Sequence, residues 1–132
     1  MAKKKVQDVE LDDLDLVRLL AWTRLVLGAA LFVAPRRIMR SWVGDAGTDR
    51  ATSVAARGMA ARDVTIAFGT LRALEGKGHL RGWVEAGAIG DAADTLSTIA
   101  SRGMPAWRRF FSLAVTGAAA VLGFRLASSL DD

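Results

Sequence analysis

The sequence predicts an all-α protein, a four-helix transmembrane bundle with short loops. No stretch alternates apolar and polar residues with the period of two that marks a half-buried strand. Four long apolar stretches are instead separated by glycine, proline or polar residues, which stop helices. The length of 132 residues suits one domain with one core. We expect a disordered polar N-terminus over residues 1–12 and a four-helix membrane domain over residues 13–130.

The first helix is expected over residues 13–34, where Arg18 and Arg24 interrupt an otherwise apolar run from residue 16 onward. Pro35 should end this helix, because proline lacks the backbone N–H that a helix interior requires. A basic turn follows over residues 36–40.

Caps and glycines bound the other three helices. Thr48 or Asp49 can cap the second helix, because both side chains can accept a hydrogen bond from the free N–H groups of a first turn. Glycines at 76–78 stop that helix, and the glycine and proline at 103–105 stop the next. We expect these helices over residues 49–74, 80–100 and 106–128.

The distribution of charge favours a membrane bundle over a soluble one. Residues Phe110 to Phe124 carry no charge on any side of the helix, which is typical of a buried or lipid-facing helix. Small residues are dense in all four stretches, and lipid-embedded bundles use them for close packing. Tryptophans fall near helix ends and loops, as in membrane-interface belts. No stretch reaches eighteen uninterrupted apolar residues, so a soluble bundle stays an alternative.

Seven ionisable residues lie deep inside these apolar stretches. They are Arg24, Arg57, Arg62, Asp63, Glu85, Asp91 and Asp94. A charge at mid-membrane is costly and is kept mainly where it is paired or functional. Asp91 and Asp94 are one helical turn apart on one face, and arginine can bind a carboxylate with two parallel hydrogen bonds.

The second and third helices should therefore insert together, with Arg62 facing the two aspartates and Arg57 a second candidate for that face. The sequence predicts a polar centre, either structural or ligand-binding. Its expected members are Arg57, Arg62, Asp63, Glu85, Asp91 and Asp94.

Several kinds of chemistry are disfavoured. The chain has no cysteine, which excludes thiol nucleophiles and thiolate metal sites. The Asp91–Asp94 pair lacks further metal ligands, and arginines nearby disfavour a cation. The scattered arginines lack the interleaved aromatic residues of a nucleic-acid platform. We expect no catalytic residue, no metal, no cofactor and no nucleic acid, and lean against an enzyme.

Two basic clusters should lie on one side of the membrane. They comprise Arg36, Arg37, Arg40, Arg108 and Arg109. Basic residues beside a bilayer attract anionic lipid headgroups, so these are candidate headgroup contacts. The alternative is ordinary charge that sets topology.

Two short segments carry a resemblance to a known family. They are Ala56-Arg57-Gly58-Met59-Ala60-Ala61-Arg62-Asp63 and Gly90-Asp91-Ala92-Ala93-Asp94. With them, residues 16–128 resemble the small four-helix integral membrane proteins of actinobacteria of the DUF4267 type, and more weakly the DoxX-like proteins. The resemblance implies a membrane location and no defined activity.

The leading interpretation is a multi-pass protein of the cell membrane that acts as a non-enzymatic accessory or structural subunit of a membrane assembly. Its partners would be the lipid bilayer and either other membrane subunits or further copies of itself. One alternative is a small carrier or ligand-binding membrane protein with an intramembrane Arg/Asp site. Another is a soluble helical bundle that binds an apolar ligand.

Overall fold

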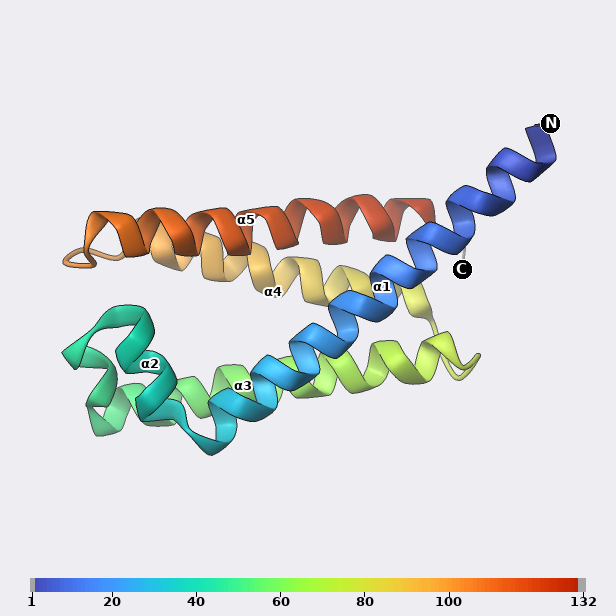
Figure 1. Ribbon diagram of the computed structural model, residues 1–132. Helices are drawn as coiled ribbons and strands as arrows, with labels where there is room; N and C mark the ends of the chain where they lie inside the picture. Colours follow the sequence, from blue (N-terminus) through green and yellow to red (C-terminus); the bar gives the residue numbers. More distant parts are fainter. Residues whose placement is uncertain (1, 131–132) are drawn as a thin grey trace.

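The computed structural model describes the backbone of residues 2–130 and the side chains of residues 13–130. Within this part the chain forms five α-helices, one short 3-10 turn and no strand, which confirms the all-α class (Figure 1). The elements are α1 (Ala2–Val33), α2 (Pro35–Val43), η1 (Asp45–Thr48), α3 (Arg50–Leu74), α4 (Leu80–Ala100) and α5 (Ala106–Ser129).

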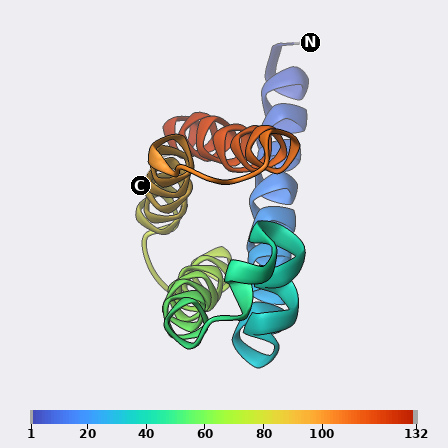
Figure 2. The ribbon, with the colours of Figure 1, turned by 90° about the vertical axis from the view of Figure 1, so that its left-hand side faces the viewer.

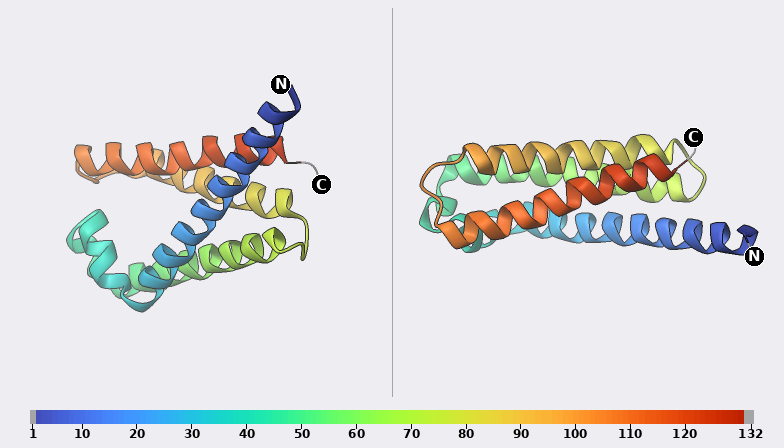
Figure 3. Two further views of the ribbon diagram at one scale, coloured as in Figure 1. Left: turned by 45° about the vertical axis from the view of Figure 1, so that its right-hand side comes forward. Right: turned by 90° about the horizontal axis from the view of Figure 1, so that it is seen from above.

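The first helix ends before Pro35 as expected, but its start and the segment after it differ from the sequence-based expectation. Residues 1–12 were expected to be disordered, but the backbone of residues 2–12 continues α1, while Met1 lies outside the described residues. These first turns extend beyond the other helices (Figure 3). Pro35 ends α1 and also begins α2, where a basic turn was expected. The missing N–H and fixed φ of proline suit the first position of a helix.

The remaining helices begin and end at the expected kinds of residue. Asp49 is the N-cap of α3, and its carboxylate accepts hydrogen bonds from the N–H groups of Ala51 and Thr52 at 2.9 and 3.4 Å. Gly76 and Gly103 follow α3 and α4 with φ of +79° and +95°, a left-handed conformation that glycine adopts without steric cost.

The four long helices form two antiparallel pairs. α1 packs mainly against α3, and α4 mainly against α5, while α1 and α5 touch little. The pairs meet chiefly where α3 faces α4. Figure 2 views the molecule from the α2 end, with α3 and α4 along one side and α1 along the other.

Glycines bring the helices of each pair close together. A Cβ atom added at Gly28 on α1 would lie 3.0 Å from the Val64 side chain of α3. One added at Gly123 on α5 would lie 2.9 Å from the Cβ atom of Ala88 on α4. Small residues at such positions are typical of helices that associate in lipid.

Most of the buried apolar residues are alanines along the helix contacts. The larger ones gather in one cluster, which consists of Val17, Val84, Leu126 and Ala127 with five partly buried leucines around it. Large apolar side chains on all four long helices are exposed instead. Examples are Leu27, Val54, Phe68, Ile89, Leu96, Phe110, Phe111 and Val121.

Two of the helices are long and apolar enough to cross a membrane: residues Asp13–Val33 of α1, and α5. This criterion does not confirm the prediction of four spans. α3 and α4 fail it, and both carry charged residues in their middle turns.

Candidate functional site

Five charged side chains from three helices form one network between the two helix pairs. The arginine–aspartate network, as we call it, consists of Arg24 of α1, Arg62 and Asp63 of α3, and Asp91 and Asp94 of α4. Arg24 donates to the carboxylates of Asp63 and Asp91 at 3.0 and 2.5 Å. Arg62 donates to Asp94 through both terminal nitrogens, at 2.8 and 3.4 Å, and to Asp63 at 3.3 Å.

Helical geometry explains how these residues meet. Asp91 and Asp94 are three residues apart, so both lie on the face of α4 that is turned toward the other pair. Arg62 and Asp63 are consecutive and therefore point about 100° apart. Arg62 thus faces α4 while Asp63 also reaches Arg24 on α1.

Two glycines of α4 make room for the two guanidinium groups. A Cβ atom at Gly87 would lie 3.3 Å from Nη2 of Arg24, and one at Gly90 would lie 3.4 Å from Cζ of Arg62. Each glycine comes four residues before the aspartate that binds the same arginine. The pattern Gly-x-x-x-Asp therefore occurs twice, overlapping, and each copy places an open space one turn before a carboxylate.

The network contains more acidic than basic side chains. It contains two arginines and three aspartates, a net charge of −1 with every group ionised. Its side chains are only 12–34% exposed. Each carboxylate nevertheless accepts at least one hydrogen bond from an arginine, which meets the requirement that a charge removed from water be paired.

Two residues predicted for the polar centre lie elsewhere. Arg57 is exposed, and its Nε donates to the carbonyl of Phe32 at 3.2 Å. It precedes Arg62 by five residues, about 140° around the helix, so the two cannot share a face. Glu85 pairs with Arg81 within α4 at 3.3 Å, because it points about 120° away from Asp91.

The sequence interpretation also omitted one member of the network. Arg24 was among the seven charges inside the apolar stretches, but its place in the centre depends on α1 packing against α3, from where the long Arg24 side chain reaches α4. Asp91 was expected to face Arg62 and instead binds Arg24. The excess of acids on α4 was the available signal, because two aspartates beside a single arginine leave one carboxylate without a partner.

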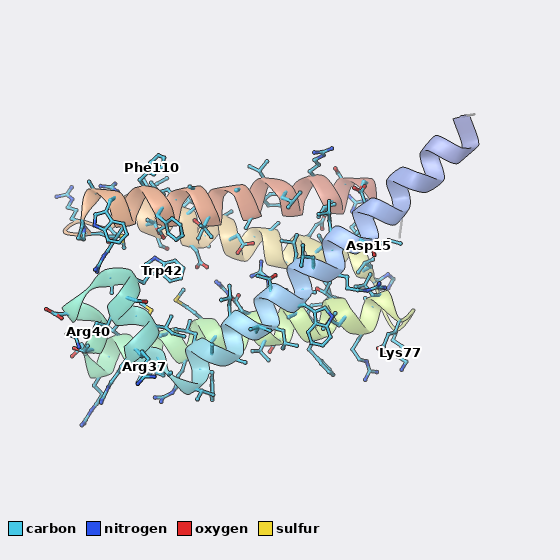
Figure 4. All side chains as sticks on the ribbon, in the orientation of Figure 1. Asp15, Arg37, Arg40, Trp42, Lys77 and Phe110 are labelled. Atoms are coloured by element: carbon cyan, nitrogen blue, oxygen red, sulfur yellow. The ribbon has the colours of Figure 1, made fainter. Side chains whose placement is uncertain are left out.

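The predicted headgroup residues lie at the α2 end and make different contacts. Arg40 pairs with Asp45 at 3.5 Å, Arg109 donates to the carbonyl of Ile99 at 2.6 Å, and Arg108 stacks on its neighbouring tryptophan ring at 5.1 Å from the centroid. Arg36 and Arg37 are exposed. Figure 4 places Arg37 and Arg40 at this end, and Asp15 and Lys77 toward the opposite one.

A polar path and a cavity adjoin the network on the side of α2. Thr98 lies 3.5 Å from Ser112 of α5, and Ser112 accepts a hydrogen bond from the indole N–H of Trp42 at 3.1 Å. The side chain of Trp42 extends from α2 toward α5 (Figure 4). The cavity has a volume of about 240 Å³, and its wall contains Asp94, several serines and threonines, and three methionines.

Comparison with family models, with curated proteins and with solved structures finds no match to this chain. The functional inference therefore depends on the geometry alone.

Proposed function

We propose that the chain is a multi-pass integral membrane protein in which α1, α3, α4 and α5 all span the bilayer, and that it serves as a non-enzymatic accessory or structural subunit. One observation carries the proposal: in the middle turns of the helices, the charged side chains of the network face inward, whereas large apolar side chains face outward. The network side chains are 12–34% exposed, whereas Leu27, Phe110 and Val121 are 64%, 76% and 71% exposed. Contiguous exposed apolar surface marks a membrane or protein contact.

The position of the network midway along the helices supports the same proposal. Arg62 lies twelve residues from each end of α3, or about 18 Å at 1.5 Å per residue. Arg24 and Asp91 are similarly central in residues 13–33 and in α4. α4 has 21 residues, about 32 Å in length, which matches a hydrocarbon thickness of about 30 Å.

The energetics explain how α3 and α4 could span the bilayer, although neither is apolar enough to do so alone. An arginine or aspartate at the centre of a single span costs about 2.5–3.5 kcal/mol. Arg62 with Asp63 would thus cost α3 about 5–7 kcal/mol in isolation. The network removes much of that cost, because the charges of α1, α3 and α4 neutralise one another.

An extraction and labelling experiment tests the proposal. The protein should stay with membranes through washes of high salt and alkaline carbonate, and detergent should release it. The chain has no cysteine, so single cysteines at Lys77 and Arg102 can report topology with a maleimide that does not cross membranes. With four spans, the two positions lie on opposite sides of the membrane.

If α1 and α5 alone span, both positions should be labelled from the same side. Release by salt without detergent would contradict the proposal and favour the soluble bundle.

The cavity beside Asp94 favours a second candidate, a small carrier or ligand-binding membrane protein with an Arg/Asp site. Its volume of about 240 Å³ would hold a small molecule, and a carboxylate on the wall could handle a proton or a cationic group. The variant Asp94→Asn distinguishes a carrier from a structural subunit. The matched control is Asp91→Asn, which removes a network carboxylate that does not line this cavity.

For a structural subunit, both variants should lose stability and neither should have a specific transport defect. For a carrier, Asp94→Asn should stay folded and lose ligand binding or uptake, whereas Asp91→Asn retains it.

A further inference from the structure

A second, strongly basic cavity opens on the outer face of the α1–α3 pair, at the α2 end. Its volume is about 520 Å³. The last residues of α1, the first turn of α2 and the first two turns of α3 line it, with four arginines among them: Arg36, Arg37, Arg50 and Arg57. Among the described side chains, no carboxylate lies within ion-pair distance of these four. The site therefore carries four unneutralised positive charges.

The start of α2 also contributes N–H donors to this cavity. α2 begins at the cavity, and its N-cap residue Ala34 supplies no side-chain acceptor to the first turn. The free N–H groups of a helix start attract anions. Arg57 lies seven residues beyond Arg50, about 10 Å further along α3 and on the same face. Its Nε donates to the carbonyl of Phe32, which leaves the two terminal nitrogens of this cavity-lining guanidinium available to a ligand.

An apolar groove continues from this cavity toward the middle of the helices. It has a volume of about 400 Å³ and is lined by Ala29, Phe32, Val33, Ala61, Val64 and Thr65. Val33 lines both spaces. On α3, Arg57, Ala61 and Val64 follow one another at helical spacing on one face. The surface is thus basic at the bundle end and apolar below it.

We infer that this surface binds an anionic phospholipid, with the headgroup phosphate among the four arginines and one acyl chain along the groove between α1 and α3. Guanidinium groups bind phosphate through paired hydrogen bonds. The order of the two parts matches a lipid, whose charge lies at the membrane surface and whose chain points inward. This inference rests on the proposed membrane location and adds a defined lipid site to it.

The test is binding of phosphatidylglycerol with a fluorescent acyl chain to the full chain in detergent micelles, with phosphatidylcholine as the reference lipid. Arg57→Gln should weaken phosphatidylglycerol binding about fivefold and leave phosphatidylcholine unchanged. Arg57→Lys, which keeps the charge, should recover part of the loss. Ala61→Trp, which fills the groove, should weaken binding with every arginine in place.

Arg102→Gln is the matched control, because it removes the same charge at the same end of the bundle from a loop outside the cavity. Equal losses for Arg57→Gln and Arg102→Gln would overturn the inference in favour of a diffuse basic surface. Displacement of the lipid by millimolar inorganic phosphate would overturn it in favour of a free-phosphate site. Tryptophan fluorescence of each variant shows whether it is folded.

The two proposals fail in distinguishable ways. Release of the protein from membranes by salt would contradict the proposed function itself. If the extraction and labelling results show four spans but the protein binds both lipids equally, only the inferred lipid site is contradicted.

Discussion

Arg24→Gln should destabilise the protein by about 3–5 kcal/mol, the typical cost of removing one partner from a buried ion pair. Arg24 bonds both Asp63 and Asp91, and its loss leaves one arginine among three aspartates. The measurement is unfolding by a denaturing detergent, followed through the fluorescence of the four tryptophans.

Two further variants control this result. Arg18→Gln, on the same helix, breaks an exposed pair with Asp15 at 3.7 Å and should change stability by less than about 1 kcal/mol. Asp91→Asn should cost clearly less than Arg24→Gln, because it leaves two arginines facing two aspartates. Equal losses for Arg24→Gln and Asp91→Asn would show that the charge balance of the network does not govern its stability.

Gly90→Leu should have the second largest effect, a loss of about 3 kcal/mol or more. The new side chain would occupy the space beside Cζ of Arg62 and separate that guanidinium from Asp94. The cost then resembles that of a broken buried pair, although no charged residue has changed.

Gly82→Leu is the matched substitution on the same helix, at a position where no atom lies within 4 Å of an added Cβ. It should leave the unfolding midpoint nearly unchanged or raise it slightly, because leucine favours a helix more than glycine does. A similar loss at both glycines would indicate a general requirement for flexibility in α4 rather than a space for Arg62.

The features that depend on local sequence were predictable. The cap at Asp49 and the glycine after α3 depend only on residues a few positions away, so both can be recognised in the sequence. Proline was ambiguous, because it ends one helix and begins another equally well; α2 was therefore missed.

The polar centre was harder to predict, because it depends on how each helix is rotated about its axis. Arg62 and Asp94 were placed together correctly, whereas Arg57 is turned to Phe32. The partners of Arg24 require knowledge of which helices are neighbours. A single sequence contains that information only indirectly, through the surplus of acids on α4.

The division of the network between the two helix pairs has a consequence for biogenesis. The first pair contributes two arginines and one aspartate, and the second pair contributes two aspartates and no arginine. In a bilayer, the N-terminal hairpin is partly self-compensated as soon as it emerges from the ribosome, whereas the C-terminal hairpin would enter with two uncompensated carboxylates. The order of synthesis thus delivers the cationic half first, as a template on which the anionic half can integrate.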